Sequence, residues 1–280
     1  EVDGTFDDCQ ALLKSLFRDE AFRDRVQLSG VNSINWARIV PQIAYYFYAA
    51  ANLGAPYRPV SFAVPTGNFG DIFAGYAAKR MGLGVDRLTI ASNSNDILPR
   101  TVASGVYEQR GVVATMSPSM DIEVSSNFER LLFEIQGRDA ALVRSQMASL
   151  VQSGRFEVKG GAATLAGEFQ ASAATEDDAA ACIRRVKTAT GYIVEPHTAC
   201  GVVAAERLLS SRNAPAVVLA TAHAAKFPEA MAQVLGQHVE LPGRLVGLMS
   251  DPERAIAVKN DINDVQRVVE GHLNAVDEVF

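Results

Sequence analysis

The stretch Pro65-Thr66-Gly67-Asn68-Phe69-Gly70-Asp71 decides how this chain is interpreted. It follows a short apolar run over 59–64 that favours a strand, and it precedes a segment, 72–81, that favours a helix. A strand, a tight glycine-rich turn and a helix start, in that order, place several unpaired backbone N–H groups and the positive end of a helix dipole at one point. Such a point binds a phosphate or another anion without any cationic side chain.

The glycine spacing of this turn separates it from two common phosphate-binding motifs. The Lys-Ser/Thr pair that follows the last glycine of a P-loop is absent, and the spacing does not fit the dinucleotide-binding fingerprint. Gly67 and Gly70 allow unusual torsions and a close approach to an anion, and Asn68 adds a side-chain donor. An ordinary strand-to-helix turn has the same local pattern, so the pattern alone leaves both interpretations open.

The composition indicates a globular protein of ordinary polarity. The 280 residues can bury a sizeable core, and 48% of them are hydrophobic while 21% are charged. The net charge of −6 argues against a nucleic-acid-binding protein, which needs a basic face. No apolar run reaches the roughly 18 residues that a membrane span needs.

Cysteine and histidine spacing gives no metal-binding pattern. Cys9, Cys182 and Cys200 are scattered and odd in number, so we expect reduced thiols in a cytoplasmic protein and no metal site. His197 and His223 lie in stretches rich in motifs, and a buried, hydrogen-bonded histidine is the plainer interpretation of each.

Alternating strands and helices predict a mostly parallel, doubly wound α/β sheet with flanking helices. The clearest strands are expected at 59–64, 87–92 and 216–220, with helices between them. Ligands in such sheets bind beyond the carboxyl ends of the strands, where the turn 65–71 and the polar loop 92–96 lie.

Other segments are less regular. A short strand is expected at 192–194, and a helical excursion from the sheet is expected over about 123–190. The stretch 154–174 is small and polar, and its fold is not assigned. A long helix over 34–53 includes Pro41, and because this helix is apolar nearly all round we expect it to be buried on most sides.

Two further polar groups stand at a helix start or a strand end. Asn32 and Ser33 lie at a helix start and Arg38 follows about a turn and a half later, so one anion can contact all three. A helix cap beside a surface arginine has the same spacing. Thr221 follows a strand, where a helix N-cap is the alternative to a ligand-binding hydroxyl.

Taken in order, these stretches resemble the threonine synthase family in the longer form found in bacteria and fungi. The resemblance covers most of the chain, and the motifs that carry it are GTFDDCQ (4–10), VNSINWARI (31–39), PTGNFGD (65–71), SNSNDIL (92–98), SPSMDI (117–122), EPHTA (195–199) and TAHAAKF (221–227). Each motif is weak by itself, whereas the ordered set is specific.

The resemblance implies a lyase of threonine biosynthesis that uses pyridoxal phosphate and has the tryptophan synthase β fold. Such an enzyme converts O-phospho-L-homoserine and water into L-threonine and phosphate. The residues implied to bind the cofactor are Gly67, Asn68, Phe69, Gly70 and Asp71 for its phosphate and Thr221 for its ring nitrogen. The residues implied to bind the phosphate of the substrate are Asn32, Ser33, Arg38 and Asn68.

The sequence departs from the family pattern at a decisive place. The Phe-Lys-Asp motif, whose lysine carries the cofactor, has no counterpart here, and neither has the Ser-Gly-Asp-Thr loop beside the cofactor. The expectation is therefore that 1–280 is the carboxyl-terminal portion of a threonine synthase, with the catalytic lysine upstream and no activity of its own. An exposed apolar patch is then expected on the helix that contains Tyr45 and Tyr48. Ala224 also stands where the family usually has proline, and Lys226 is given no role.

Two alternatives to a threonine synthase stay open. A threonine-synthase-like phospholyase, or another β-replacement enzyme of the same fold, would share the cofactor site. A non-catalytic homologue would keep an anion site without chemistry. The sequence is compatible with a monomer or a homodimer.

Overall fold

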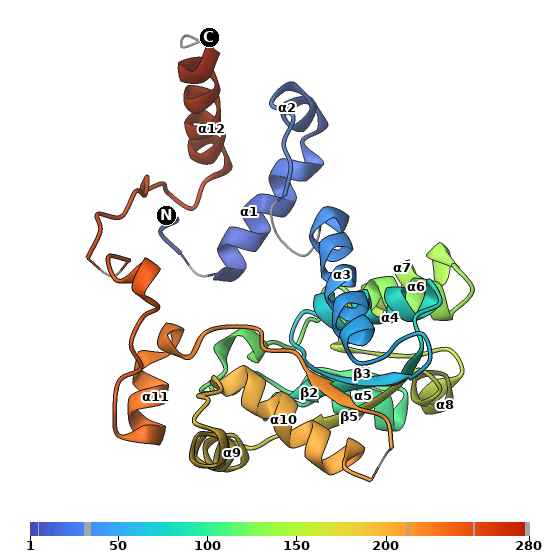
Figure 1. Cartoon of the computed structure of the whole chain (residues 1–280). Helices are drawn as coiled ribbons and strands as arrows, with labels where there is room; N and C mark the ends of the chain where they lie inside the picture. The colour runs from blue at the N-terminus through green and yellow to red at the C-terminus, as the bar shows by residue number, and fades with distance from the viewer. Residues whose placement is uncertain (5, 31–34, 212, 249, 278–280) are drawn as a thin grey trace. The chain divides into compact units, whose positions relative to one another are not determined.

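The structure is a computed structural model of the chain (Figure 1), and it describes residues 1–4, 6–30, 35–211, 213–248 and 250–277. Two compact units are described one at a time. The larger unit is Asn32–Leu241, and the smaller unit combines Glu1–Val31 with Pro242–Phe280.

A four-stranded parallel sheet organises the larger unit. Its strands are β1 (Val60–Pro65), β2 (Val85–Ser92), β5 (Phe169–Ala173) and β6 (Ala216–Val218), in the order β5-β2-β1-β6. Every neighbouring pair is parallel, so the predicted parallel α/β fold is confirmed.

Helices cover both faces of this sheet. Phe62 and Val64 of β1 belong to the main core together with residues of α4 (Gly70–Arg80), whereas Ala63 packs with Leu209 of α10 (Pro196–Leu209). Figure 1 shows α4 and α10 on opposite sides of the strands. Because side chains alternate along a strand, a strand covered on both faces is mostly apolar, and this explains the run at 59–64, in which Ser61 is buried and hydrogen-bonded to Asp86.

The larger unit has further helices. They are α3 (Trp36–Asn52), α5 (Ile97–Ser104), α6 (Phe128–Ile135), α7 (Ala140–Ser153), α9 (Glu176–Thr190) and α11 (Pro228–Leu235). Local signals fix several boundaries. Thr175 and Asp178 form a reciprocal capping box at the start of α9, and Pro41 is accommodated within α3.

The segment from 123 to 190 mixes helices with strands. Strand β4 (Arg155–Glu157) pairs antiparallel with β3 (Val106–Glu108), far away in the sequence. The short helix α8 (Gly161–Ala166) follows, and β5 then joins the main sheet beside β2. These elements account for the stretch 154–174, whose small residues gave no clear periodicity.

Two expectations about local structure were wrong. The expected strand at 192–194 is irregular backbone, because Val194 is buried as part of a core cluster and not through pairing in a sheet. Helix α3 buries only a narrow stripe that includes Ile39 and Tyr46. The expected exposed apolar patch is confirmed, since Tyr48 is 76% exposed and Tyr45 is 59% exposed.

The smaller unit is helical. It contains α1 (Phe6–Arg18), α2 (Glu20–Arg25) and α12 (Ile262–Asp277), and Gln266 donates a hydrogen bond of 3.0 Å to the carboxylate of Asp19. Among all the helices that the structure describes, none has the length and apolar character needed to cross a membrane.

Candidate functional site

The turn after β1 has a fixed and unusual backbone. Phe69, the residue before α4, adopts a left-handed conformation with φ 67°, which a residue with a side chain rarely takes. The side-chain oxygen of Asn68 accepts a hydrogen bond of 2.9 Å from the amide of Gly70. Phe69 is fully buried, and its ring makes edge contacts with Phe128 and Phe169 at 5.2 and 5.7 Å between centroids. Packing therefore holds a conformation that costs about 1 kcal/mol or more.

Several amide groups at this turn make no hydrogen bond to the described residues. Within the described part of the chain, the amides of Phe69, Asp71 and Ile72 have no hydrogen-bond acceptor. They lie at the N-terminus of α4, a helix of 11 residues, where the helix dipole favours an anion. Main-chain groups arranged in this way can bind an anion such as a phosphate.

Gly67 lies in close contact with a second loop. A Cβ atom at Gly67 would be 2.5 Å from the carbonyl oxygen of Ser119, so no other residue fits there without movement of the backbone. Ser119 is held in turn, because its amide donates to Nε2 of His197 at 3.1 Å. Packing therefore requires the glycine at position 67. The expectation of unusual torsions at Gly67 and Gly70 was wrong, because neither has a positive φ and the left-handed residue of the turn is Phe69.

His197 belongs to a buried network that connects this loop to α10. Its Nδ1 lies 2.7 Å from the carboxylate of Glu195, which gives the tautomer with hydrogen on Nδ1 and a free electron pair on Nε2 for Ser119. Burial disfavours a charged Glu195, but hydrogen bonds from His197 and Thr198 outweigh it and hold the pKa of Glu195 below its usual value. His197 is thus the buried, hydrogen-bonded histidine that was expected, whereas the same expectation was wrong for His223, which is exposed.

Thr221 lies beside the same carboxylate. Its hydroxyl donates a long hydrogen bond of 3.4 Å to Glu195, and the side chain is exposed. The alternative of a helix cap does not apply, since the residue that caps the following short helix is His223, which accepts from the amide of Ala225. The ammonium group of Lys226 lies 5.8 Å from the ring centroid of Phe227.

The predicted residues for the substrate phosphate are only partly described. Asn32 and Ser33 lie outside the described residues. Arg38 is exposed in the first turn of α3, which is capped by Asn35. Its neighbour Ile39 packs against the turn after β1, because the Cδ1 of Ile39 would lie 3.3 Å from a Cβ at Gly70. This places the start of α3 next to the turn.

Asp71 is the one anionic group of the turn. Burial raises the pKa of its carboxyl to about 6, although a hydrogen bond from Tyr46 opposes the shift. The carboxyl is directed toward Tyr46 of α3, with 3.4 Å between the hydroxyl and Oδ1. Because the carboxyl points toward Tyr46, the backbone amide is the group of Asp71 that can contact an anion.

Two residues that sequence reasoning missed contact the turn from outside. Ser125 and Asn127 hydrogen-bond the carbonyl oxygens of Gly67 and Asn68. Both are more than 55 residues away along the chain, so no local spacing connects them to the turn. The position of an asparagine directly before a helix is the one sequence feature that could have indicated Asn127.

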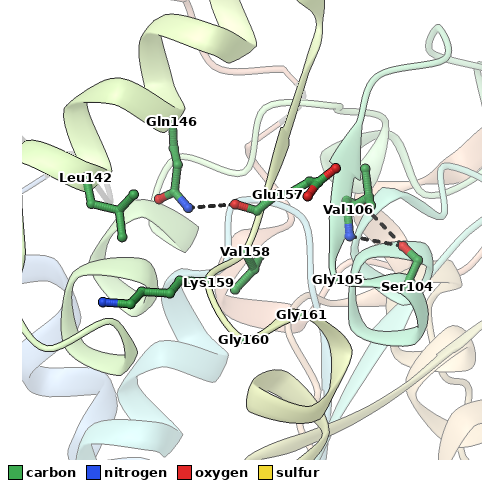
Figure 2. Close-up of a pocket in the computed structure, with 10 residues that line it drawn as sticks. All are labelled: Ser104, Gly105, Val106, Leu142, Gln146, Glu157, Val158, Lys159, Gly160 and Gly161. Carbon is green, nitrogen blue, oxygen red and sulfur yellow. Dashed lines mark hydrogen bonds between the residues drawn. The ribbon is translucent and has the colours of Figure 1, made fainter.

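A separate cavity of about 390 Å³ lies between β4, α7 and the loop before α8 (Figure 2). Its polar groups largely bond to one another: Gln146 donates to the carbonyl oxygen of Glu157 at 2.8 Å, and Ser104 bonds Val106. None of the predicted site residues lines it. Within the described residues, no group of His, Cys, Asp and Glu side chains is arranged to hold a metal ion.

Comparisons with known proteins agree on one family. The family described as "Threonine synthase, C-terminal" matches residues 198–269. The chain is 45% identical over 275 residues to threonine synthase of Pseudomonas aeruginosa, covering 98% of this chain and 59% of that protein. It is 38% identical over 298 residues to threonine synthase of Saccharomyces cerevisiae, covering 99% of this chain and 58% of that protein.

A solved structure of a relative extends the agreement to three dimensions. The crystal structure of pyridoxal-phosphate-bound threonine synthase from Brucella melitensis matches with a TM-score of 0.88 and 54% sequence identity, covering 97% of this chain and 59% of that one. The chain thus spans about three-fifths of the length of these relatives. Over nearly its whole length, the chain is thus similar in sequence and in structure to part of the threonine synthases.

Proposed function

We propose that this chain forms the phosphate-binding part of a threonine synthase that uses pyridoxal phosphate. The observation that carries the proposal is the group of unpaired amides at Phe69, Asp71 and Ile72, in a chain that matches a cofactor-bound relative at 54% identity. A phosphate accepts hydrogen bonds from amides arranged in this way.

The proposed reaction is the conversion of O-phospho-L-homoserine and water into L-threonine and phosphate. When bound, the cofactor supplies an electron-withdrawing ring next to the α-carbon of the substrate. The residues of this chain bind and orient: the turn 67–71 holds the cofactor phosphate, and Asn68 borders both phosphates. Arg38, with Asn32 and Ser33, holds the phosphate of the substrate, where a guanidinium gives strong charge-assisted hydrogen bonds.

Thr221 is proposed to hold the ring nitrogen. Its hydroxyl hydrogen rotates to suit its partners, so it can turn from Glu195 to the ring while the backbone stays in place. The buried Glu195 fixes the position of this hydroxyl and, through His197, that of the loop beside Gly67.

We also propose that these 280 residues do not turn over substrate alone, since no lysine of the sequence lies in a Phe-Lys-Asp motif. The free thiols of Cys9, Cys182 and Cys200 fit a reducing compartment, which supports a cytoplasmic location.

A chimaera tests the proposed reaction. The amino-terminal part of the Brucella enzyme that this chain does not cover would be joined to residues 1–280, and threonine and 2-ketobutyrate released from O-phospho-L-homoserine would be measured. We expect threonine from the chimaera and none from the chain alone. Release of 2-ketobutyrate as the main product would favour the phospholyase alternative, and a chimaera that binds the cofactor but forms neither product would favour the non-catalytic one.

A further inference from the structure

Both carbonyl groups on the outer side of the turn are hydrogen-bonded to one distant segment. The hydroxyl of Ser125 donates to the carbonyl oxygen of Gly67 at 2.6 Å. The backbone amide and the side-chain amide of Asn127 both donate to the carbonyl oxygen of Asn68, at 2.9 and 3.2 Å. Ser125 is 5% exposed and Asn127 is 1% exposed, so water does not compete for these bonds.

Fixing these carbonyls also fixes the amides on the other side of the same peptide groups. A peptide group is planar and trans, so its C=O and N–H bonds point in opposite directions. The amide of Asn68 belongs to the peptide group of the Gly67 carbonyl, and the amide of Phe69 belongs to that of the Asn68 carbonyl. Both N–H bonds therefore point away from Ser125 and Asn127, toward the proposed phosphate.

We propose that Ser125 and Asn127 are positioning residues that aim the amides of Asn68 and Phe69 at the bound phosphate. This inference rests on the proposed function of the turn. Neither residue touches the ligand: each acts through a carbonyl oxygen. Without them the left-handed Phe69 has less to hold it, and the two peptide groups are free to rotate.

The segment that carries these residues is itself rigidly held. The amide of Ser125 donates to the hydroxyl of Tyr107 at 2.9 Å, and that hydroxyl donates to the carbonyl oxygen of Glu123 at 3.1 Å. The Tyr107 ring stacks on Phe156 of β4 at 4.9 Å and on Phe128 at 5.4 Å. The pairing of β3 with β4 thus supports the segment 125–128, and this gives the excursion from the sheet a role in building the site.

Asn127 is oriented for this role by a second contact. Its side-chain oxygen accepts a hydrogen bond of 2.9 Å from Nε of Arg130, which fixes which end of the amide group faces Asn68. Arg130 lies with its guanidinium 5.6 Å from the ring centroid of Trp36, at the start of α3. The same side chain therefore connects the positioning residue to the helix that bears Arg38.

The test measures binding of pyridoxine 5′-phosphate, which carries the ring and phosphate without a reactive aldehyde, to the 280-residue chain by titration calorimetry. We expect Ser125→Ala and Asn127→Ala each to weaken binding by roughly five- to tenfold, as the loss of one buried hydrogen bond predicts. Ser125→Thr keeps a hydroxyl and is expected to restore most of the affinity. Ser149→Ala is the matched control, because this serine also donates to a backbone carbonyl, Arg155, at 2.7 Å.

A second measurement follows the amide group of Phe69 directly. In the ligand-free chain, the NMR amide signal of Phe69 is expected to shift in Ser125→Ala and Asn127→Ala and to stay in place in Ser149→Ala. Alanine variants that bind within twofold of the unchanged chain would overturn this inference and leave the proposed function standing. An unchanged chain that fails to bind the probe at millimolar concentration would overturn both.

Discussion

The hydroxyl of Tyr46 donates a hydrogen bond of 2.8 Å to the backbone carbonyl of Asp71, and so joins the middle of α3 to the first turn of α4. The Tyr46 ring is fully buried and lies 4.8 Å from the ring of Phe62 in β1, measured between centroids. One side chain therefore connects the strand before the turn, the helix after it and the helix that bears Arg38. The relative positions of the two proposed phosphate sites depend on this contact.

The close approach of α3 and α4 predicts the effect of a small substitution. A Cβ atom at Gly75 would lie 2.5 Å from Cε1 of Tyr46. In Gly75→Ala we expect overpacking to cost up to about 3 kcal/mol, against a gain of about 1 kcal/mol in helix propensity, so the free energy of unfolding should fall by up to about 2 kcal/mol. Urea unfolding measures the difference.

A matched control separates the two effects. Gly167 has φ −65° and ψ −27°, and its added Cβ would meet no atom nearer than 3.6 Å, so Gly167→Ala should be neutral or slightly stabilising. If Gly75→Ala were as stable as the unchanged chain, the packing of α4 on Tyr46 would be wrong.

The titration of Asp71 predicts a pH dependence of stability. Burial raises the pKa of this carboxyl to about 6 in the folded chain, against about 4 in an unfolded one. The folded state binds this proton more tightly than the unfolded state does. The stability that the bound proton contributes is therefore fully present below about pH 4 and is lost as the pH rises through 6.

Asp71→Asn removes this titration. We expect the variant to gain about 1–2 kcal/mol relative to the unchanged chain between pH 4.5 and 7.5, allowing for partial contact of the carboxyl with solvent. Urea midpoints at the two pH values test this. A stability difference that stays constant across that range would show that Asp71 does not titrate as described.

The sequence predicted the elements whose signals are local. The turn 65–71, its strand and its helix were predicted because the spacing of apolar residues and the positions of glycines are signals that extend over only a few residues. The pairing of β3 with β4 and the contacts of Ser125 with Gly67 were not predictable, since they join residues far apart in the chain. The interpretation of 192–194 as a strand failed because burial in a loop and burial in a sheet select the same apolar residues.

Gly67 is expected to be essential for phosphate binding. Its Cβ would collide with the carbonyl oxygen of Ser119, which is backbone and cannot move aside as a flexible side chain does. Gly67→Ala should therefore weaken binding of pyridoxine 5′-phosphate by more than roughly tenfold, as even one lost charge-assisted hydrogen bond predicts. Gly84→Ala, where the nearest atom would be 3.9 Å away, serves as the control. Equal affinities of the two variants for pyridoxine 5′-phosphate would show that Gly67 is not part of the binding site.

Arg38 is expected to act on the substrate and not on the cofactor. In the chimaera with the Brucella amino-terminal part, Arg38→Ala should raise the KM for O-phospho-L-homoserine by roughly 10- to 100-fold, the value of a hydrogen bond between charged groups. Retention of pyridoxal phosphate, followed by absorbance after gel filtration, should be unchanged. Loss of the cofactor from this variant would contradict the assignment of two separate phosphate sites.

The most direct test of the account is a crystal structure of the chain grown with pyridoxine 5′-phosphate. We expect phosphate oxygens within about 3 Å of the amide nitrogens of Phe69 and Asp71, with the ring on the side of Thr221. Density for the phosphate elsewhere on the chain, with the turn 67–71 empty at saturating ligand, would contradict it.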